Sequence, residues 1–325
     1  MVKVVKLYEL GGPEKFVIED VDPPMPGPGE VLLRNHAVGL NFYDVYERSG
    51  VYPAELPAVL GMESAGVVEQ LGEGVSHLDV GDRVAHGTVG GSYADVMLAP
   101  ADQLLRLPDG IAFDTAAAMM GKGMTVEPLV TRTYAVQPGD VVLFHAAAGG
   151  VGLIACQWLK AIGATVIGTV SSDEKAELAR AHGCDHPVVT PRESFVDKVM
   201  ELTGGEGCPV VYDSIGRDTY DDSMKCVRRR GLLVSFGQSS GLVEPHRPNV
   251  LTGAGSIYLT RPTMGDYVVT RAELEQTAQN LFDMVLAGKV RIEIGQTYPL
   301  TDIGQAHRDL EARKTKGSTV LLPQP

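Results

Sequence analysis

The chain is poor in the features that mark a disulfide-bonded or membrane-spanning protein. Its 325 residues include only four cysteines, and none of them forms a C-x-x-C pair or clusters with histidine. We therefore expect free thiols and a cytoplasmic location, because disulfides are typical of oxidising compartments. No apolar run has the length of a signal-peptide core or a membrane span, so neither segment is expected.

Basic residues are also fewer than acidic residues. The sequence has 28 Lys and Arg against 41 Asp and Glu, a formal charge of −13. Nucleic-acid and membrane surfaces are bound through a basic excess, so we expect neither kind of partner. The one basic run, Arg228-Arg229-Arg230, is typical of a solvated helix end, where cations favour the C-terminal dipole.

The length and the 44% hydrophobic content instead favour two ordinary globular domains. The first part of the chain carries short apolar or alternating segments, such as 2–8, 16–20 and 30–38, between glycine and proline clusters. Such segments predict a β-rich, partly barrel-like domain with few helices.

The pattern changes after about residue 121. Strand-like runs at 141–146, 165–170, 187–189, 210–215 and 232–236 alternate with helix-like runs, and 256–260 is a last strand candidate. This alternation predicts an α/β fold, a doubly wound parallel sheet with helices on both faces. A helix at 267–288, an extended segment, a second helix and a strand at 318–322 break the alternation and should return to the first domain. We expect a catalytic domain at 1–122 plus 264–325 and an inserted Rossmann domain at 123–263.

The most informative motif is the glycine turn between the first of these strands and its helix. The sequence HAAAGGVG ends in Gly149, Gly150, Val151 and Gly152. A glycine turn in this setting is a dinucleotide-binding fingerprint, because the backbone can approach a pyrophosphate at the helix N-terminus. The first glycine of G-x-G-x-x-G is Ala147 here, and a merely structural turn is the alternative.

The end of the second strand indicates which dinucleotide is bound. NAD enzymes place an acidic residue there to hold the ribose hydroxyls. Here the strand ends at Ser171 and Ser172, Asp173 comes slightly late, and Lys175 follows. Hydroxyls and a cation suit a 2′-phosphate, so NADPH is favoured. Ser172 is equally a good helix N-cap, and the two roles are compatible.

Taken together, several short stretches resemble the quinone oxidoreductase (zeta-crystallin-like) branch of the medium-chain dehydrogenase/reductase superfamily. They are AAAGGVGLIACQ, GLNFYD, GMESAG, VGDRV, YDSIG, GLLVSFG and TRP, and the likeness runs from end to end. The resemblance implies that the β-rich domain is GroES-like and that NADPH binds between two domains.

The resemblance also implies which residues meet the cofactor. Asn41 and Tyr46 would lie near the nicotinamide and the substrate, with no firm general acid among them. Other implied contacts are Thr125, the Gly149–Val151 turn, Ser172 with Lys175, Ser235, Phe236, Gly237, Ser240 and Arg313. Thr190 stands where the branch often has a tyrosine, which weakens one expected phosphate contact.

The same comparison argues against zinc. The zinc-binding relatives use a cysteine and a histidine where this chain resembles them with Asn41 and Met62, and these are poor Zn²⁺ ligands. Without zinc to acidify an alcohol, an electron-poor quinone is the favoured hydride or electron acceptor. An enone or alkenal C=C reductase is the enzymatic alternative, and an NADPH-binding structural or RNA-binding protein the other. Pairing of the 256–260 edge strand, together with the resemblance, favours a homodimer.

Overall fold

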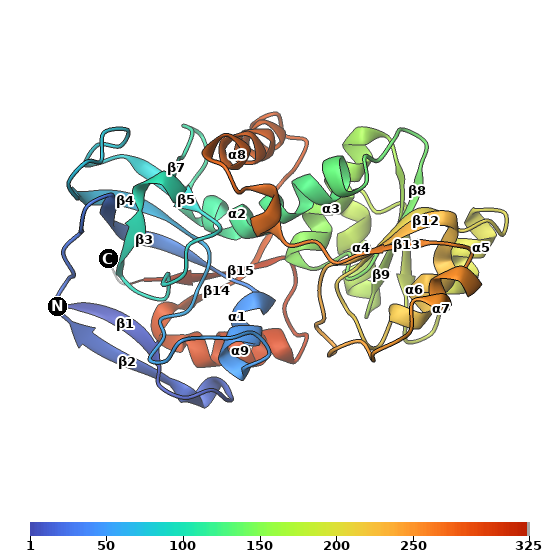
Figure 1. Cartoon of the computed structure of the whole chain (residues 1–325), viewed down its shortest axis with the longest axis horizontal. Coiled ribbons are helices and arrows are strands. Elements are labelled where there is room, and N and C mark those ends of the chain that lie inside the picture. Colours follow the sequence, from blue (N-terminus) through green and yellow to red (C-terminus); the bar gives the residue numbers. More distant parts are fainter. Residues whose placement is uncertain (324–325) are drawn as a thin grey trace. The chain divides into compact units, whose positions relative to one another are not determined.

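A computed structural model describes residues 1–323 and divides the chain into two compact units. Unit 1 contains Met1–Met124, Val268–Leu286 and the chain from Ile292 on, and unit 2 contains Thr125–Tyr267 and Ala287–Arg291. The chain therefore leaves unit 1, forms most of unit 2 and returns to unit 1, and residues 287–291 belong to unit 2 again (Figure 1). Within the described residues, no helix is both long and apolar enough to cross a membrane.

Unit 1 is built around a seven-stranded, mostly antiparallel sheet. The strands run in the order β14 (Ile294–Pro299), β15 (Ser318–Leu322), β3 (Glu30–Leu40), β4 (Ser64–Leu71), β5 (Arg83–His86) and β7 (Leu105–Arg106), with β6 (Val96–Pro100) also paired to β3. A separate hairpin joins β1 (Val2–Leu7) to β2 (Phe16–Val21). This arrangement confirms the β-rich first domain.

Two apolar clusters hold the strands of unit 1 together. One is centred on Val31, Leu33 and Val68, and the other on Leu7, Leu40 and Leu321. Since Leu321 lies in β15, the returning C-terminal segment supplies part of the core of the first domain.

Unit 1 also has helices that the sequence did not predict. They are α1 (Phe42–Ser49) and α2 (Phe113–Pro128), of which the residues from Thr125 on belong to unit 2, and they accompany the two expected C-terminal helices, α8 (Arg271–Leu286) and α9 (Ile303–Glu311). Helix α1 follows β3 directly and ends at Gly50, whose φ of 81° is the left-handed conformation that glycine adopts readily.

Unit 2 is a doubly wound parallel sheet. The strands run in the order β10 (His186–Val189), β9 (Thr165–Val170), β8 (Val141–Phe144), β11 (Cys208–Asp213), β12 (Val227–Ser235) and β13 (Tyr258–Thr260). Helices α3 (Gly150–Ile162), α4 (Asp173–Ala181), α5 (Phe195–Leu202) and α6 (Tyr220–Cys226) form the crossovers and flank this sheet (Figure 1). Short elements complete the unit, namely α7 (Asn249–Gly253) and a π-helical turn at Leu129–Thr133.

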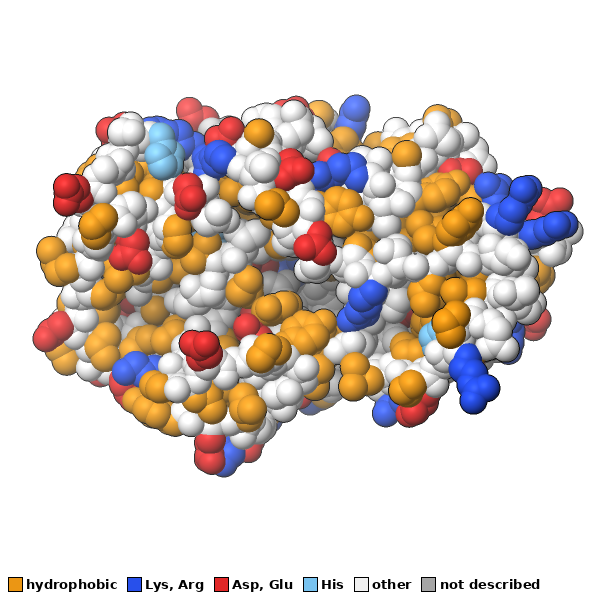
Figure 2. Space-filling model, viewed as in Figure 1, with side chains coloured by type: hydrophobic (Ala, Val, Ile, Leu, Met, Phe, Trp, Pro, Cys, Tyr) orange, Lys and Arg blue, Asp and Glu red, His pale blue; other side chains and the backbone are white. Residues whose placement is uncertain are grey.

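Two details of unit 2 differ from the prediction. Strand β13 has only three residues, because Ser256 adopts a φ of 56° and Ile257 donates its N–H to the Leu251 carbonyl. The three arginines at 228–230 lie on β12 instead of a helix end, and they are exposed. On the face drawn in Figure 2, basic side chains gather at the end of unit 2 that carries α5, with acidic ones among them.

The four cysteines all lie in unit 2, where they are buried and free. The expectation of free thiols is therefore confirmed.

Candidate functional site

The predicted nucleotide site of unit 2 comes together at the carboxyl ends of its parallel strands. The glycine turn follows β8, the serines follow β9, and Ser235 ends β12. This edge is where open α/β sheets bind their ligands. The structure therefore gathers most of the predicted cofactor residues at one edge of one sheet.

The turn after β8 is shaped by its glycines. A Cβ on Gly152 would lie only 2.3 Å from the Ala146 carbonyl oxygen, so a side chain there would displace the turn. A Cβ on Gly149 would meet that oxygen at 3.3 Å and nothing else nearby. Gly149 is the N-cap of α3, and because it has no side chain it supplies no capping oxygen to the N–H groups of the first turn. The first turn of α3 therefore offers the backbone N–H groups and partial positive charge that suit a pyrophosphate.

Polar side chains gather at the tip of β9. The Ser172 hydroxyl accepts the Lys175 backbone N–H at 3.3 Å and caps α4. Because a hydroxyl both donates and accepts, its own proton remains able to bind a phosphate oxygen. The predicted capping role is confirmed, and it is compatible with cofactor binding.

Arg192 is a cation at this tip that the sequence did not predict. It extends from the turn after β10 and forms a bidentate ion pair with Asp173, the first residue of α4; its Nη1 lies 2.7 Å from Oδ2. Thr190 turns its hydroxyl to the Val170 carbonyl at 3.2 Å. The signal in the sequence was an arginine two positions beyond Thr190, but only the parallel pairing of β9 and β10 brings it beside the serines.

A loop after β12 carries the next group of predicted residues. Arg261 donates to the carbonyls of Ser235 at 3.0 Å and Gly237 at 2.9 Å. A Cβ on Gly237 would lie 2.6 Å from the Ser214 carbonyl oxygen, so the loops after β11 and β12 touch at this point. The Ser240 hydroxyl donates to Ile215 O at 2.8 Å and accepts from Asp218 N at 3.0 Å. Ser240 therefore ties these loops together.

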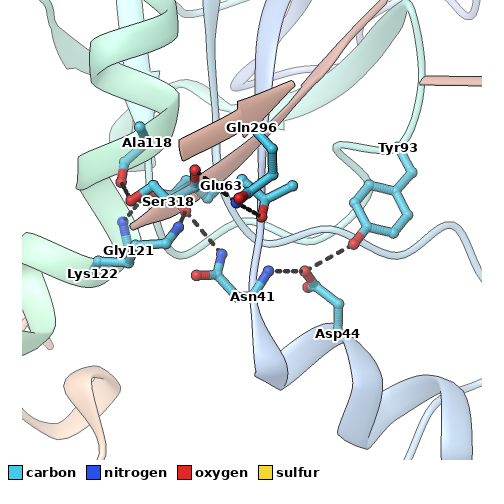
Figure 3. A network of polar contacts seen from close by, with 10 residues as sticks. Asn41, Asp44, Glu63, Tyr93, Ala118, Gly121, Lys122, Gln296 and Ser318 are labelled. Carbon is cyan, nitrogen blue, oxygen red and sulfur yellow. Dashed lines mark hydrogen bonds and ion pairs between the residues drawn. The ribbon is translucent and has the colours of Figure 1, made fainter. Parts of the chain in front are cut away.

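Asn41 is the centre of a polar network in unit 1 (Figure 3). Its backbone N–H donates to Asp44 Oδ2 at 2.8 Å, and its side-chain Nδ2 donates to Glu63 Oε2 at 2.8 Å. Asn41 stands directly before α1, so the first contact belongs to the cap of that helix. Both carboxylates are fully buried, and Asn41 is therefore held at its backbone and at its side chain.

Asp44 is the end of a chain of hydrogen bonds that runs through Tyr93 and His307 to Arg48. The Tyr93 hydroxyl donates to Asp44 Oδ2 at 2.8 Å and lies 3.1 Å from His307 Nε2. On the other side of the ring, Arg48 Nη1 lies 3.0 Å from His307 Nδ1. Arginine can only donate, so Nδ1 must accept, and Nε2 carries the proton that it donates to Tyr93.

Burial tunes the acids and bases of this chain. It raises the pKa of Asp44 to about 7, against the N–H of Asn41 and the Tyr93 hydroxyl, which both lower it. Burial and the Arg48 charge lower the pKa of His307 to about 3, so the imidazole is neutral. A neutral His307 is what the hydrogen-bond directions require.

Glu63, which follows Met62 in the sequence, has a partner that the sequence did not reveal. Lys122 Nζ on α2 lies 2.8 Å from Glu63 Oε2, and the two side chains are 6% and 0% exposed. The Gly121 N–H donates to Glu63 Oε1 at 2.8 Å. The signal was a lysine in an otherwise apolar helical stretch, Met119-Met120-Gly121-Lys122-Gly123, which was not recognised as helical.

The remaining predicted residues lie on or near helices α1, α2 and α9 and in the segment before β4. Tyr46 on α1 packs against Tyr52, with ring centroids 5.1 Å apart. Thr125 lies on α2, and Arg313 follows α9 with a φ of 58°. Met62 is next to Glu63 in the segment before β4. Within residues 1–323, no three His, Cys, Asp or Glu side chains are grouped so that they could hold a metal ion.

Comparisons with known proteins identify the family. Residues 27–109 match the alcohol dehydrogenase GroES-like domain, and residues 150–283 match the family described as zinc-binding dehydrogenase. The quinone oxidoreductase of Pseudomonas aeruginosa is 50% identical, and the match covers 99% of this chain and 100% of that one. A 2-haloacrylate reductase of a Burkholderia species is 44% identical over the whole of both chains.

A solved structure adds the cofactor. Escherichia coli quinone oxidoreductase complexed with NADPH superposes with a TM-score of 0.97 at 44% identity, covering 99% of this chain and 100% of that one. The chain belongs to the quinone oxidoreductase branch of the medium-chain dehydrogenase/reductase family.

Proposed function

We propose that this protein reduces quinones to hydroquinones with NADPH and without a metal ion. The observation that carries the proposal is the environment of Asn41. Its amide nitrogen is committed to Glu63, and Glu63 is already neutralised by Lys122. These groups offer no means to acidify an alcohol, whereas a quinone accepts hydride without that help. The full-length similarity to quinone oxidoreductases supports the same reading.

The two units have separate roles in this proposal. Unit 2 binds NADPH, with the pyrophosphate at Gly149, Gly150, Val151 and Gly152 and the 2′-phosphate at Ser171, Ser172 and Lys175. Ser235, Phe236, Gly237 and Ser240 line the nicotinamide side. Unit 1 supplies Asn41 and Tyr46 toward the nicotinamide and the substrate, and Thr125 and Arg313 add cofactor contacts.

The chain's own contribution to the chemistry is orientation. NADPH, when bound, supplies the hydride. Asn41 and Tyr46 hold the electron-poor ring in a fixed orientation. Much of the acceleration in such a reaction comes from holding the two reactants in the right geometry. One solvent proton completes the balance, because NADPH, quinone and H⁺ give NADP⁺ and hydroquinone.

Reduction of an activated C=C bond is the second candidate. It is favoured by the 2-haloacrylate reductase relative, which matches this chain over its whole length. An enone or haloacrylate also has an electron-poor π system, but the carbon next to the reduced position must take up a proton.

A substrate panel separates the two candidates. NADPH oxidation is followed at 340 nm with 1,4-benzoquinone, a larger naphthoquinone, an enone and 2-chloroacrylate, and the products are identified by chromatography. We expect kcat/KM to be highest for a quinone, with hydroquinone as product. Faster turnover of the enone or haloacrylate would replace the first function with the second, and no turnover of any of them would favour the structural or RNA-binding alternative.

We also propose a cytoplasmic homodimer that pairs through β13. This strand is last in its sheet order, and its Tyr258 and Leu259 side chains are 64% and 37% exposed. An uncovered edge strand of this kind favours pairing with a second copy.

A further inference from the structure

Glu63 and Lys122 form a buried ion pair that hydride transfer does not itself require. Removing two charges from water is costly, and a buried pair is weak evidence for stability. A contribution to stability therefore does not by itself account for the pair. A hydrogen bond from Asn41 Nδ2 to Glu63 Oε2, 2.8 Å long, joins the pair to a proposed site residue (Figure 3).

The surroundings of the Glu63 carboxylate are built to receive it. A Cβ on Gly39 would lie 2.3 Å from Glu63 Oε2 and 2.2 Å from the Ala117 carbonyl oxygen, so only glycine leaves room at this position of β3. The Gly121 N–H takes up Oε1, while Lys122 and Asn41 share Oε2. The carboxylate is thus fixed by backbone, cation and amide at once.

We propose that the Glu63–Lys122 ion pair positions the Asn41 side chain. An ionised carboxylate only accepts hydrogen bonds, so the Asn41 amide must turn its NH₂ group toward Glu63 and its Oδ1 atom away. Lys122 Nζ lies 2.8 Å from the same Oε2 and holds the carboxylate in place. The inference rests on the role proposed above for Asn41.

This arrangement decides which groups Asn41 can offer. One N–H is held by Glu63, so the order in which the amide presents its second N–H and its Oδ1 atom is fixed. The backbone N–H is held separately by Asp44. A flipped amide would exchange donor and acceptor at the reacting ring and misplace it without any change of fold.

A double-mutant cycle tests the proposal. The variants are Asn41→Ala, the neutralised pair Glu63→Gln with Lys122→Met, and the combination of all three. The pair is changed together because a single change would leave one buried charge unpaired. We expect the pair variant to lose about tenfold in kcat with a quinone, within the range for coupled neighbours. The Kd for NADPH should stay within about twofold, because the phosphates supply most of that binding.

We expect the effects of the pair variant and of Asn41→Ala on kcat to be fully coupled. Once Asn41 is alanine, the pair has nothing to position, so the triple variant should match Asn41→Ala in kcat. Ser318→Ala is the matched control, because Ser318 is buried and bonds the Ala118 carbonyl of the same helix at 2.8 Å. It should lower the melting temperature and leave kcat unchanged.

Two conservative variants keep the test valid if the pair variant does not fold. Glu63→Asp withdraws the carboxylate from Asn41 and should lower kcat, whereas Lys122→Arg keeps the cation and should lose less. Independent losses in the cycle, or full kcat in Glu63→Asp, would overturn the positioning role. No effect of Asn41→Ala would instead show that Asn41 itself was wrongly assigned.

Discussion

At the tip of β9, we propose that a few side chains set the choice of cofactor. The strand ends without an acid, and the Ser172 hydroxyl keeps a donor after capping α4. Lys175 lies on the first turn of that helix, and Arg192 neutralises Asp173 beside it. In our proposal a 2′-phosphate meets Lys175 and the Ser172 hydroxyl here, whereas a ribose hydroxyl would find the Asp173 carboxylate already held by Arg192.

Lys175→Ala should reduce the preference for NADPH. Charge-assisted hydrogen bonds contribute about 1.5–3 kcal/mol, so we expect a loss of roughly tenfold or more in NADPH affinity. The affinity for NADH should hardly change, and Arg192→Ala should act in the same direction. The Kd values are measured by fluorescence titration, with Lys198→Ala as a control because Lys198 pairs with Glu201 on the surface of α5. Equal affinities of the parent for both cofactors would contradict the assignment.

His307 should make stability depend on pH. Its pKa is about 3 in the folded protein against 6.5 for the free group, so its contribution is complete above pH 6.5 and is lost as the pH falls toward 3. Each unit of pH in that range costs about 1.4 kcal/mol. Asp44 acts in the opposite direction. Its pKa is raised from 3.8 to about 7 in the folded protein, so its contribution to stability is lost as the pH rises from 3.8 to about 7.

We expect His307→Gln to flatten the acid side of the profile. The free energy of unfolding is measured by urea denaturation at pH 7 and pH 4.5 in the parent and the variant. The parent should lose about 2–3 kcal/mol more than the variant between these values. The same loss in both proteins would show that His307 is not the group that titrates.

Among the elements, the parallel strands of unit 2 were easiest to predict. The apolar run that forms β8 is buried on both faces, and such runs differ plainly from amphipathic helices. Helices α1 and α2 were missed for different reasons. Helix α1 has eight residues and only Asn41 and Asp44 as a start signal, while α2 is apolar on nearly all sides and shows no clear period. The burial of Glu63 and Lys122 follows from packing between distant segments, so the sequence could not reveal their contact.

Gly152→Leu should disrupt the phosphate turn. The new side chain would collide with the Ala146 carbonyl, since even a Cβ would lie 2.3 Å away. We expect NADPH affinity to fall by more than about tenfold with a moderate loss of stability, because overpacking typically costs about 1–3 kcal/mol. Gly253→Ala, on α7 with nothing within 4 Å of the added Cβ, is the control. Unchanged NADPH affinity in folded Gly152→Leu would mean that the turn does not hold the cofactor.

For the whole molecule, the proposed homodimer depends on the edge of the unit 2 sheet. Proline at Tyr258 or Leu259 removes one N–H from β13, and whichever of them faces the second copy should weaken the dimer. Ile257 is unsuitable for this test because its N–H already serves the Leu251 carbonyl. Mass is measured by light scattering at micromolar concentration. A monomeric parent would refute the dimer, and dimers in both folded variants would refute β13 as the contact.

The central claim is that NADPH reduces a quinone on this chain without metal. The most direct test is the steady-state rate of benzoquinone reduction by protein that has been dialysed against a strong chelator, with NADPH and NADH compared at equal concentration. We predict full activity after dialysis, no stoichiometric zinc by elemental analysis, and a higher kcat/KM for NADPH. Activity that disappears on dialysis and returns with zinc, or a higher kcat/KM for NADH, would contradict the account.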